Sequence, residues 1–305
     1  MRTRIYSYLL LLAPLCGRAQ QRLELNLQKG ASYSHTVSTV SKIHQEIADN
    51  AVDLSTTVGA KTVYTVTSVR DSSYGMEVRY KNMSMKMEGG GMDMSFSSDS
   101  SKQDMMSKLL SSFINASFWI DVSKRGNITE VTGIDSIVRK MLDRPELAGM
   151  DKKTLEEQFM KTYGTESFKG NFDMFMFIYP PSGKINKAEK WTVPLHIGGG
   201  GIDAVVTMVY ELVSENGDEY TIHGEGKLST PEDSPTMNQS GVEMKFKLSG
   251  RMTSDFKIAK QTGWIRSGRV EQAMDGGIEL KKSAMLPEAV TIPVNINNTT
   301  EVTGQ

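Results

Sequence analysis

The residues whose types and spacing stand out for chemistry are methionines. The chain of 305 residues has 20 of them, and eight lie within 31 residues, from 76 to 106. Methionines alternate with other residues on both sides of a glycine-rich turn at 88–91. Alternate residues of a strand share a face, so this hairpin presents five thioethers and one ring on one side. These six candidate ligand-binding residues are Met83, Met85, Met87, Met92, Met94 and Phe96.

Three interpretations of this methionine face are open. It is a core face that the following helix covers, since methionine fills irregular gaps between a sheet and a helix. It is an adaptable apolar pocket for a lipid-like or peptide ligand, because flexible methionine surfaces repack around varied partners. It is a thioether site for Cu(I), a soft metal. Copper is the weakest of the three because no histidine lies near the hairpin in sequence. We predict neither a metal site nor a cofactor.

Other side chains lack the spacing of a catalytic or metal site. The four histidines form no His-Glu-x-x-His zinc motif, and the sequence has no Gly-x-Ser-x-Gly nucleophile motif. The glycine run at 198–201 lacks the Lys-Ser/Thr of a phosphate-binding loop and is typical of a turn between strands.

The remaining candidates for acid–base chemistry are Glu156, Glu157 and Asp203. The two glutamates lie beside lysines on a predicted amphipathic helix, which is typical of a solvated face. We therefore predict no catalytic residues and a protein that is not an enzyme. A hydrolase whose acids come from distant parts of the chain is a less favoured alternative.

Composition excludes several classes of protein. The formal net charge of −1 argues against nucleic-acid binding, which needs a basic surface. Hydrophobic residues make up 38% of the chain and charged residues 23%, which excludes a disordered tail and a membrane protein with many spans. The length is sufficient for one large domain or two smaller ones, each with a sizeable core.

Residues 1–19 have the pattern of a signal peptide. Arg2 and Arg4 precede an apolar run at 9–13, and small residues at 17 and 19 predict cleavage after Ala19. The removed segment holds three arginines, no acid and the one cysteine, so the mature charge becomes −4 and the mature chain is disulfide-free. We expect an exported protein, periplasmic or extracellular, with no transmembrane segment after signal removal. Lipid anchoring at Cys16 is a minor alternative.

Hydrophobic periodicity predicts strands at both ends of the chain and helices between them. Period-two alternation from residue 22, at 62–80 and beyond residue 191 indicates antiparallel strands. A 3.6-residue period indicates helices after Ser101, at 134–142, after Asp151 and after Thr165, where each of the three named residues is a predicted cap. The segment 230–240 is predicted as a polar loop.

The predicted fold class is α+β, mainly antiparallel β. Two β regions form a curved sheet or half-barrel, and a helical block is inserted between them. The predicted divisions are 20–132 for the N-terminal β region with one amphipathic helix, 133–181 for the helical block and 182–305 for the C-terminal β region.

The two β regions resemble each other, which an internal duplication would explain. Each begins with an aromatic residue after a short polar turn, Tyr33 in one and Trp191 in the other. Each then has a hairpin, followed later by a strand, a turn with glycine and a second strand. The glycines of those turns are Gly126 and Gly263.

A series of short motifs gives the chain a family resemblance. In order they are the alternating Leu23, Leu25 and Leu27, Lys29-Gly30-x-x-Tyr33, Met83-Ser84-Met85-Lys86-Met87, Ser123-Lys124-Arg125-Gly126-Asn127-Ile128, Phe177-Ile178-Tyr179-Pro180-Pro181 before Trp191, and Thr262-Gly263-Trp264-Ile265. Together they resemble an uncharacterised exported family of Gram-negative bacteria, known as a domain of unknown function. The family has Gly-Asp-x-Trp where this chain has Ala188-Glu189-Lys190-Trp191. The resemblance implies export and fold, and it implies no activity. The architecture is also loosely similar to that of envelope lipoprotein carriers.

The function that we expect is binding of an apolar ligand, lipid-like or peptide, by a non-catalytic protein of the cell envelope. The alternative is a structural or interaction module with a fully packed methionine core that contacts other envelope proteins. Whether the methionine face is sealed or open distinguishes the two.

Overall fold

The computed structural model describes residues 21–47, 50–99, 101, 104–114, 116–147, 149, 151–186, 189–199, 202–234, 236–239, 242–283 and 286–305. The predicted signal peptide with Cys16, the motif residue Ala188 and half of the glycine run at 198–201 lie outside these residues.

Strands dominate the chain, and four α-helices are found among the described residues. The strands are β1 (Gln21–Arg22), β2 (Ser32–Ile47), β3 (Asn50–Val69), β4 (Ser73–Gly89), β5 (Met92–Ser97), β6 (Ser117–Ser123), β7 (Ile128–Thr132), β8 (Lys184–Ile185), β9 (Lys190–Gly199), β10 (Ile202–Asn216), β11 (Glu219–Ser229), β12 (Met237–Gln239), β13 (Val242–Ala259), β14 (Ile265–Leu280) and β15 (Val290–Gly304). The helices are α1 (Met105–Ser111), α2 (Ile134–Leu142), a 3-10 turn η1 (Pro145–Leu147), α3 (Lys152–Tyr163) and α4 (Thr165–Met176).

The two β regions form one antiparallel sheet. Its order is β7-β6-β4-β3-β2-β15-β14-β13-β11-β10-β9, with β5 paired to β4 and β12 paired to β13. The pairing of β15 with β2 joins the two regions. On either side of β15 the strands run in the same sequential order, β7-β6-β4-β3-β2 and β14-β13-β11-β10-β9, as an internal duplication predicts. The predicted mainly antiparallel α+β fold with a curved sheet and inserted helices is confirmed.

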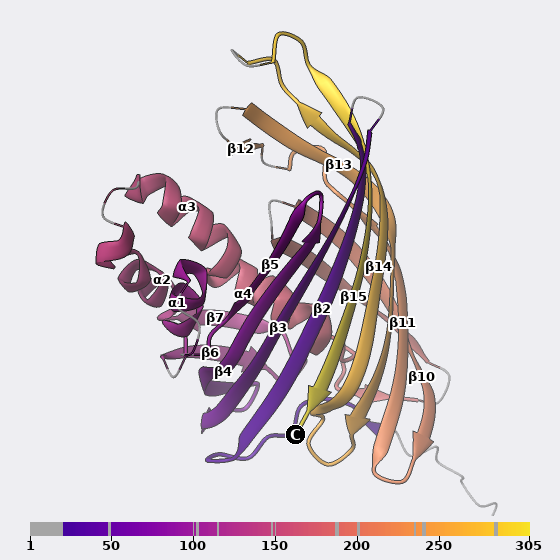
Figure 1. Ribbon diagram of the computed structural model, residues 1–305. Helices are drawn as coiled ribbons and strands as arrows, with labels where there is room; N and C mark the ends of the chain where they lie inside the picture. The colour runs from indigo at the N-terminus through magenta and orange to yellow at the C-terminus, as the bar shows by residue number, and fades with distance from the viewer. Residues whose placement is uncertain are drawn as a thin grey trace, which may run out of the picture.

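The sheet curves around α4, so that one face is concave and the other convex (Figure 1). Helix α4 contacts both edge strands, β7 and β9, and also β14. Its buried aromatic residues Phe168, Phe172 and Phe175 pack in the main core. Helices α1, α2 and α3 form an arm beside the sheet, and the upper parts of β13, β14 and β15 extend beyond that arm (Figure 1).

The lower core contains a buried histidine. His35 stacks on Trp264 with ring centroids 4.3 Å apart, and Phe175 lies edge-on at 5.3 Å. Burial lowers the pKa of His35 to about 3, so the ring is neutral. It serves here as a flat packing group among aromatic rings.

The N-terminal leucines correct one prediction. Leu23, Leu25 and Leu27 are buried, as their alternation indicates, but only Gln21–Arg22 form a strand, paired with β8. The backbone N–H groups of residues 23, 25 and 26 donate to carbonyls of three separate turns, at 183, 124 and 262. This extended segment therefore crosses the lower end of the sheet and ties its turns together.

Two predicted helix caps were wrong. Asp104, rather than Ser101, caps α1 by accepting from the backbone N–H of Ser107 at 2.8 Å. Gly164 is the N-cap of α4, and the Thr165 hydroxyl donates to Asp135 of α2 at 3.0 Å. The Asp151 cap of α3 is confirmed. The predicted loop at 230–240 also contains a short strand, β12, because its residues add to the edge of β13.

Candidate functional site

The predicted methionine face is formed by the hairpin of β4 and β5. The register pairs Met85 with Phe96 and Met87 with Met94, and Met83 pairs with Ala60 of β3. Ala60 in turn pairs with Val37, which packs in the main core. All six candidate residues therefore lie on the concave side of the sheet.

Burial decreases along this hairpin. Met83 is 8% exposed, whereas Met92 and Met94 are 36% and 37% exposed. Val58, which pairs with Met85 on the same face, is 39% exposed. The methionine face is thus sealed at one end and open at the other.

Helix α1 seals the lower end of the hairpin. Met83 belongs to a small core with Leu109, Leu110 and Phe113, and residues of α2 complete that core. The backbone N–H of Ser97 donates to the Ser107 hydroxyl at 2.9 Å, which fixes the start of α1 against the end of β5. Met83 is therefore a core residue, and for the exposed upper residues the pocket interpretation stays a prediction.

The open surface continues across the sheet. Partly buried or exposed apolar side chains occupy concave register positions from β5 through β4, β3, β2, β15, β14 and β13 to β12. We call this surface the apolar trough. Its residues are Ile43, Val52, Leu54, Val58, Met85, Met87, Met92, Met94, Phe96, Met237, Met244, Phe246, Leu280, Val290 and Ile292.

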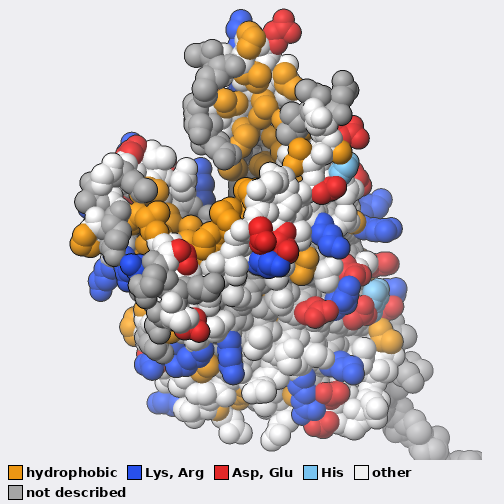
Figure 2. Space-filling model, in the orientation of Figure 1, with side chains coloured by type: hydrophobic (Ala, Val, Ile, Leu, Met, Phe, Trp, Pro, Cys, Tyr) orange, Lys and Arg blue, Asp and Glu red, His pale blue; other side chains and the backbone are white. Residues whose placement is uncertain are grey.

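Figure 2 shows the trough as a hollow between the upper sheet and the helical arm. Hydrophobic side chains gather on the upper sheet and on the facing side of the arm (Figure 2). Within the arm, the partly buried Leu155, Phe159 and Met160 of α3 pack against the small core that contains Met83. A contiguous apolar surface of this kind is a candidate site for a ligand or a partner.

A row of uncharged polar residues crosses the middle of the concave face, and its register continues into Val58, Met85 and Met87 of the trough. The register places Gln272, Asn298, Ser41 and Thr56 side by side, with Thr300 and Thr39 in the next row down. We call these six residues the polar stripe. The Asn298 amide donates to the Gln272 carbonyl oxygen at 2.9 Å, and the hydroxyls of Thr39 and Thr300 are 2.9 Å apart.

The convex face carries the charge. Cross-strand ion pairs join Lys247 to Glu279 at 2.7 Å and Arg269 to Glu301 at 2.9 Å.

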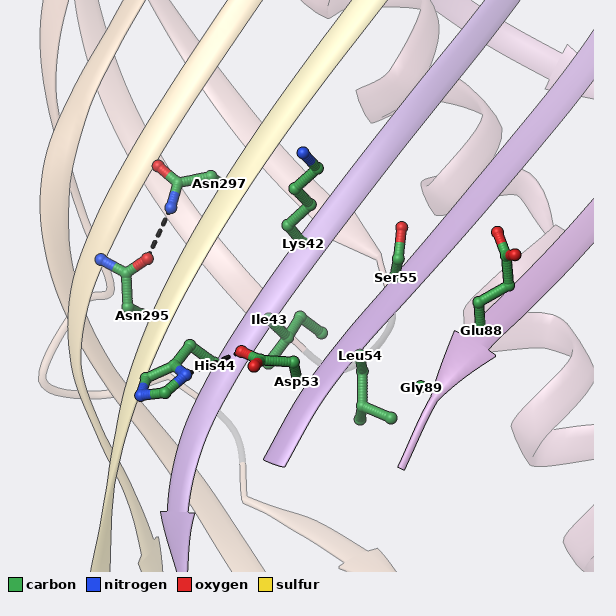
Figure 3. A pocket seen from close by; sticks show the side chains of 10 residues that line it. All are labelled: Lys42, Ile43, His44, Asp53, Leu54, Ser55, Glu88, Gly89, Asn295 and Asn297. Carbon is green, nitrogen blue, oxygen red and sulfur yellow. Dashed lines mark hydrogen bonds and ion pairs between the residues drawn. The ribbon is translucent and has the colours of Figure 1, made fainter. Parts of the chain in front are cut away.

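A shallow depression of about 360 Å³ on the convex face is lined mainly by polar side chains, including His44, Asp53 and Asn297 (Figure 3). The His44 ring nitrogen lies 2.8 Å from the Asp53 carboxylate, and both side chains are exposed. Because water reaches both groups, this depression is a weak candidate for chemistry.

The acids predicted as the remaining catalytic candidates stay apart from the trough. Glu156 pairs with Arg139 of α2 at 2.9 Å, and Asp203 pairs with His196 across the β9–β10 hairpin. Glu157 is exposed on α3. Among the described residues no three His, Cys, Asp or Glu side chains are grouped as metal ligands. No helix of the described chain is long and apolar enough to cross a membrane.

Sequence reasoning missed the part of the trough that β13, β14 and β15 contribute. The alternation that includes Phe246 and Leu248 indicated a long strand, but it did not indicate that β15 joins β2. Without that pairing, Ile292 and Leu280 could not be placed on the face that bears Met87 and Met94. The polar stripe gave no signal, because its members lie on four strands that belong to two distant hairpins.

The fold and the trough define a class: an open, curved antiparallel sheet with a helix inside it and an apolar concave face. Residues 71–265 match the model of a family of unknown function, DUF6263. The chain belongs to this family, and the resemblance found in the sequence is confirmed. No curated protein matches the chain.

Solved structures resemble the fold at low sequence identity. A lipovitellin structure, titled for its lipid–protein interactions, has a TM-score of 0.51 at 10% identity over 92% of this chain. The chain spans only 25% of the lipovitellin chain. An outer membrane channel from Pseudomonas putida F1 matches 92% of this chain and 98% of its own length at 8% identity, with a TM-score of 0.24. The lipovitellin likeness shows a shared fold.

Proposed function

We propose that the protein is a non-catalytic, exported protein of the cell envelope that binds a lipid-like ligand in the apolar trough. The single observation that carries this proposal is the exposure of concave apolar side chains, above all Met92, Met94 and Val58. A concave face packed only against its own helices would bury these residues. Each methylene group of a ligand that leaves water at such a surface contributes about 0.8 kcal/mol to binding.

The segregation of charge supports the proposal. Ion pairs cover the convex face, which suits water, whereas the concave face offers apolar surface to a ligand. The similar fold of lipovitellin, whose structure is titled for lipid–protein interactions, adds support at the level of the fold. The methionines add adaptability, since their flexible side chains fit ligands of varied shape.

The test is direct analysis of protein purified from the envelope of the producing cell without detergent. We expect native mass spectrometry to show a mass excess of lipid size, and organic extraction to release that compound. A protein that carries no such mass and binds no apolar probe added afterwards would contradict the proposal.

The edge strand β5 favours a second candidate, an interaction module. β5 pairs with β4 along one side, and its Met92 and Met94 are exposed. Unpaired strand edges accept strands from partner proteins. Cross-linking from Ser95 in the envelope that yields a specific protein partner, together with an absence of bound lipid, would favour this function.

A further inference from the structure

The polar stripe lies inside an otherwise apolar face. Directly above it the register places Met274, Ile296, Ile43 and Leu54, and below it lie Val302 and other apolar residues. Gln272 is 7% exposed. Burying a polar side chain costs free energy of folding unless the side chain forms hydrogen bonds, so the partners of these residues matter.

Two polar side-chain atoms of the stripe lack a strong hydrogen-bond partner within the protein. The Gln272 amide nitrogen has only thioether sulfurs nearby, that of Met174 at 3.6 Å and that of Met252 at 3.8 Å. Thioether sulfur is a weak acceptor. The side-chain oxygen of Asn298 is buried and has no hydrogen-bond partner within the protein. An acceptor oxygen of a ligand would satisfy the Gln272 amide nitrogen better than the two sulfurs do.

The charge pattern of the sheet restricts what that polar group is. On β2, β5, β13 and β15 the described charged side chains all occupy convex register positions. They are Lys42, Glu46, Asp93, Glu243, Lys245, Lys247, Arg251, Asp255, Lys257 and Glu301. An ionised headgroup placed at the stripe would lose its water without gaining a counter-charge, which is strongly unfavourable.

We infer that the ligand is an uncharged lipid whose ester group lies at the polar stripe and whose hydrocarbon chain extends along the apolar trough. This inference rests on the proposed function and names its substrate class. The neutral ester carbonyl accepts from the Gln272 amide. The nine residues of β15 from Val290 to Asn298 span about 26 Å. That exceeds one acyl chain, which fills half of the roughly 30 Å hydrocarbon core of a bilayer.

The test compares three probes with equal chain length: methyl palmitate, n-hexadecane and palmitate anion. Each displaces a polarity-sensitive fluorescent alkyl probe from the purified protein at pH 8. The variant Gln272→Met, Asn298→Leu replaces both amides by apolar groups of similar size, which limits the folding cost. The control Asn297→Leu alters the neighbouring asparagine on the convex face.

We expect the wild-type protein to bind the ester about three to ten times more tightly than the hydrocarbon, the factor that one hydrogen bond provides. The double variant should bind both equally, and Asn297→Leu should keep the preference. Equal binding of ester and hydrocarbon by the wild type, or a preference for the anion, would overturn the inference and leave the proposed function standing. Failure of the wild type to bind any of the probes would contradict both.

Discussion

Asp173 is a partly buried carboxyl whose charge opposes folding. It lies on α4, and its side chain accepts from the backbone N–H of Ile128 on β7 at 2.8 Å. Burial raises the pKa of Asp173 to about 6, which the Ile128 hydrogen bond and the charge of Lys169 offset only in part. The folded state therefore holds this proton at pH values where the unfolded chain has lost it.

The pH dependence follows from this raised pKa. Between about pH 4 and 6 the folded state binds more protons than the unfolded state, so the contribution of Asp173 to stability falls as pH rises. Asp173→Asn keeps the acceptor oxygen and removes the charge. Chemical denaturation should show the variant to be more stable than wild type by about 1–2 kcal/mol at pH 7.5, after allowance for partial solvent contact. The difference should vanish below pH 4, and a pH-independent difference would refute this assignment.

Predictions for single residues succeeded where the interaction is local and failed where the partner is distant in the sequence. Asp151 caps α3 as predicted because a cap is a local interaction between neighbours. Thr165 donates to Asp135 instead of capping α4. That partner lies thirty residues away and becomes available only when α2 and α4 pack together.

At the scale of elements, α4 is held by the turn between β6 and β7. Gly126 has a φ of 87°, and a Cβ added there would lie 1.8 Å from the carbonyl oxygen of Met176, the last residue of α4. The turn and the end of the helix therefore fit together only because residue 126 has no side chain.

Two glycine-to-alanine variants test this contact. Gly126→Ala should lower the free energy of unfolding by about 3–4 kcal/mol, from backbone strain plus displacement of α4. Gly30→Ala is the matched control, because its φ of 82° is similar but nothing lies within 4 Å of the added Cβ. It should cost about 1–2 kcal/mol, the strain alone. Urea denaturation measures both, and equal losses would show that the contact with α4 contributes nothing.

Elements with strong periodicity were predictable, and their partners were not. The bounds of α2 and the hairpin of β4 and β5 follow from spacing and from glycines between them. The alternating leucines of 23–27 have the periodicity of a strand, but periodicity does not reveal that their backbone N–H groups bond to turns. These partners are set only when the sheet has assembled and brought its turns together.

At the scale of the whole molecule, the leucine segment closes the lower end of the sheet. Leu25 is fully buried, and its carbonyl accepts from the Tyr74 hydroxyl at 2.9 Å. Leu25→Ala should reduce the free energy of unfolding by about 2–5 kcal/mol, since the cavity left behind cannot collapse fully. Thermal denaturation is the measurement, with exposed Gln28→Ala as the control. A loss below 1 kcal/mol would mean that the segment does not seal the core.

The trough itself belongs to this scale, because eight strands contribute to it. The five methionines of the hairpin could be predicted to share a face from their spacing alone. The residues on β13, β14 and β15 could not, because the two β regions join through the pairing of β2 with β15, which are far apart in the chain.

The measurement that tests the central claim most directly is binding of a fluorescent alkyl probe to a matched pair of variants. Met94→Glu places a carboxylate in the trough, whereas Ser95→Glu places one on the convex side, where it faces Lys86. Both residues are exposed, so neither change disrupts the core. We predict that the wild type and Ser95→Glu bind the probe equally and that Met94→Glu binds it at least tenfold more weakly, a difference of about 1.4 kcal/mol. Equal binding by the two variants, or none by the wild type, would contradict a lipid-binding trough on the concave face.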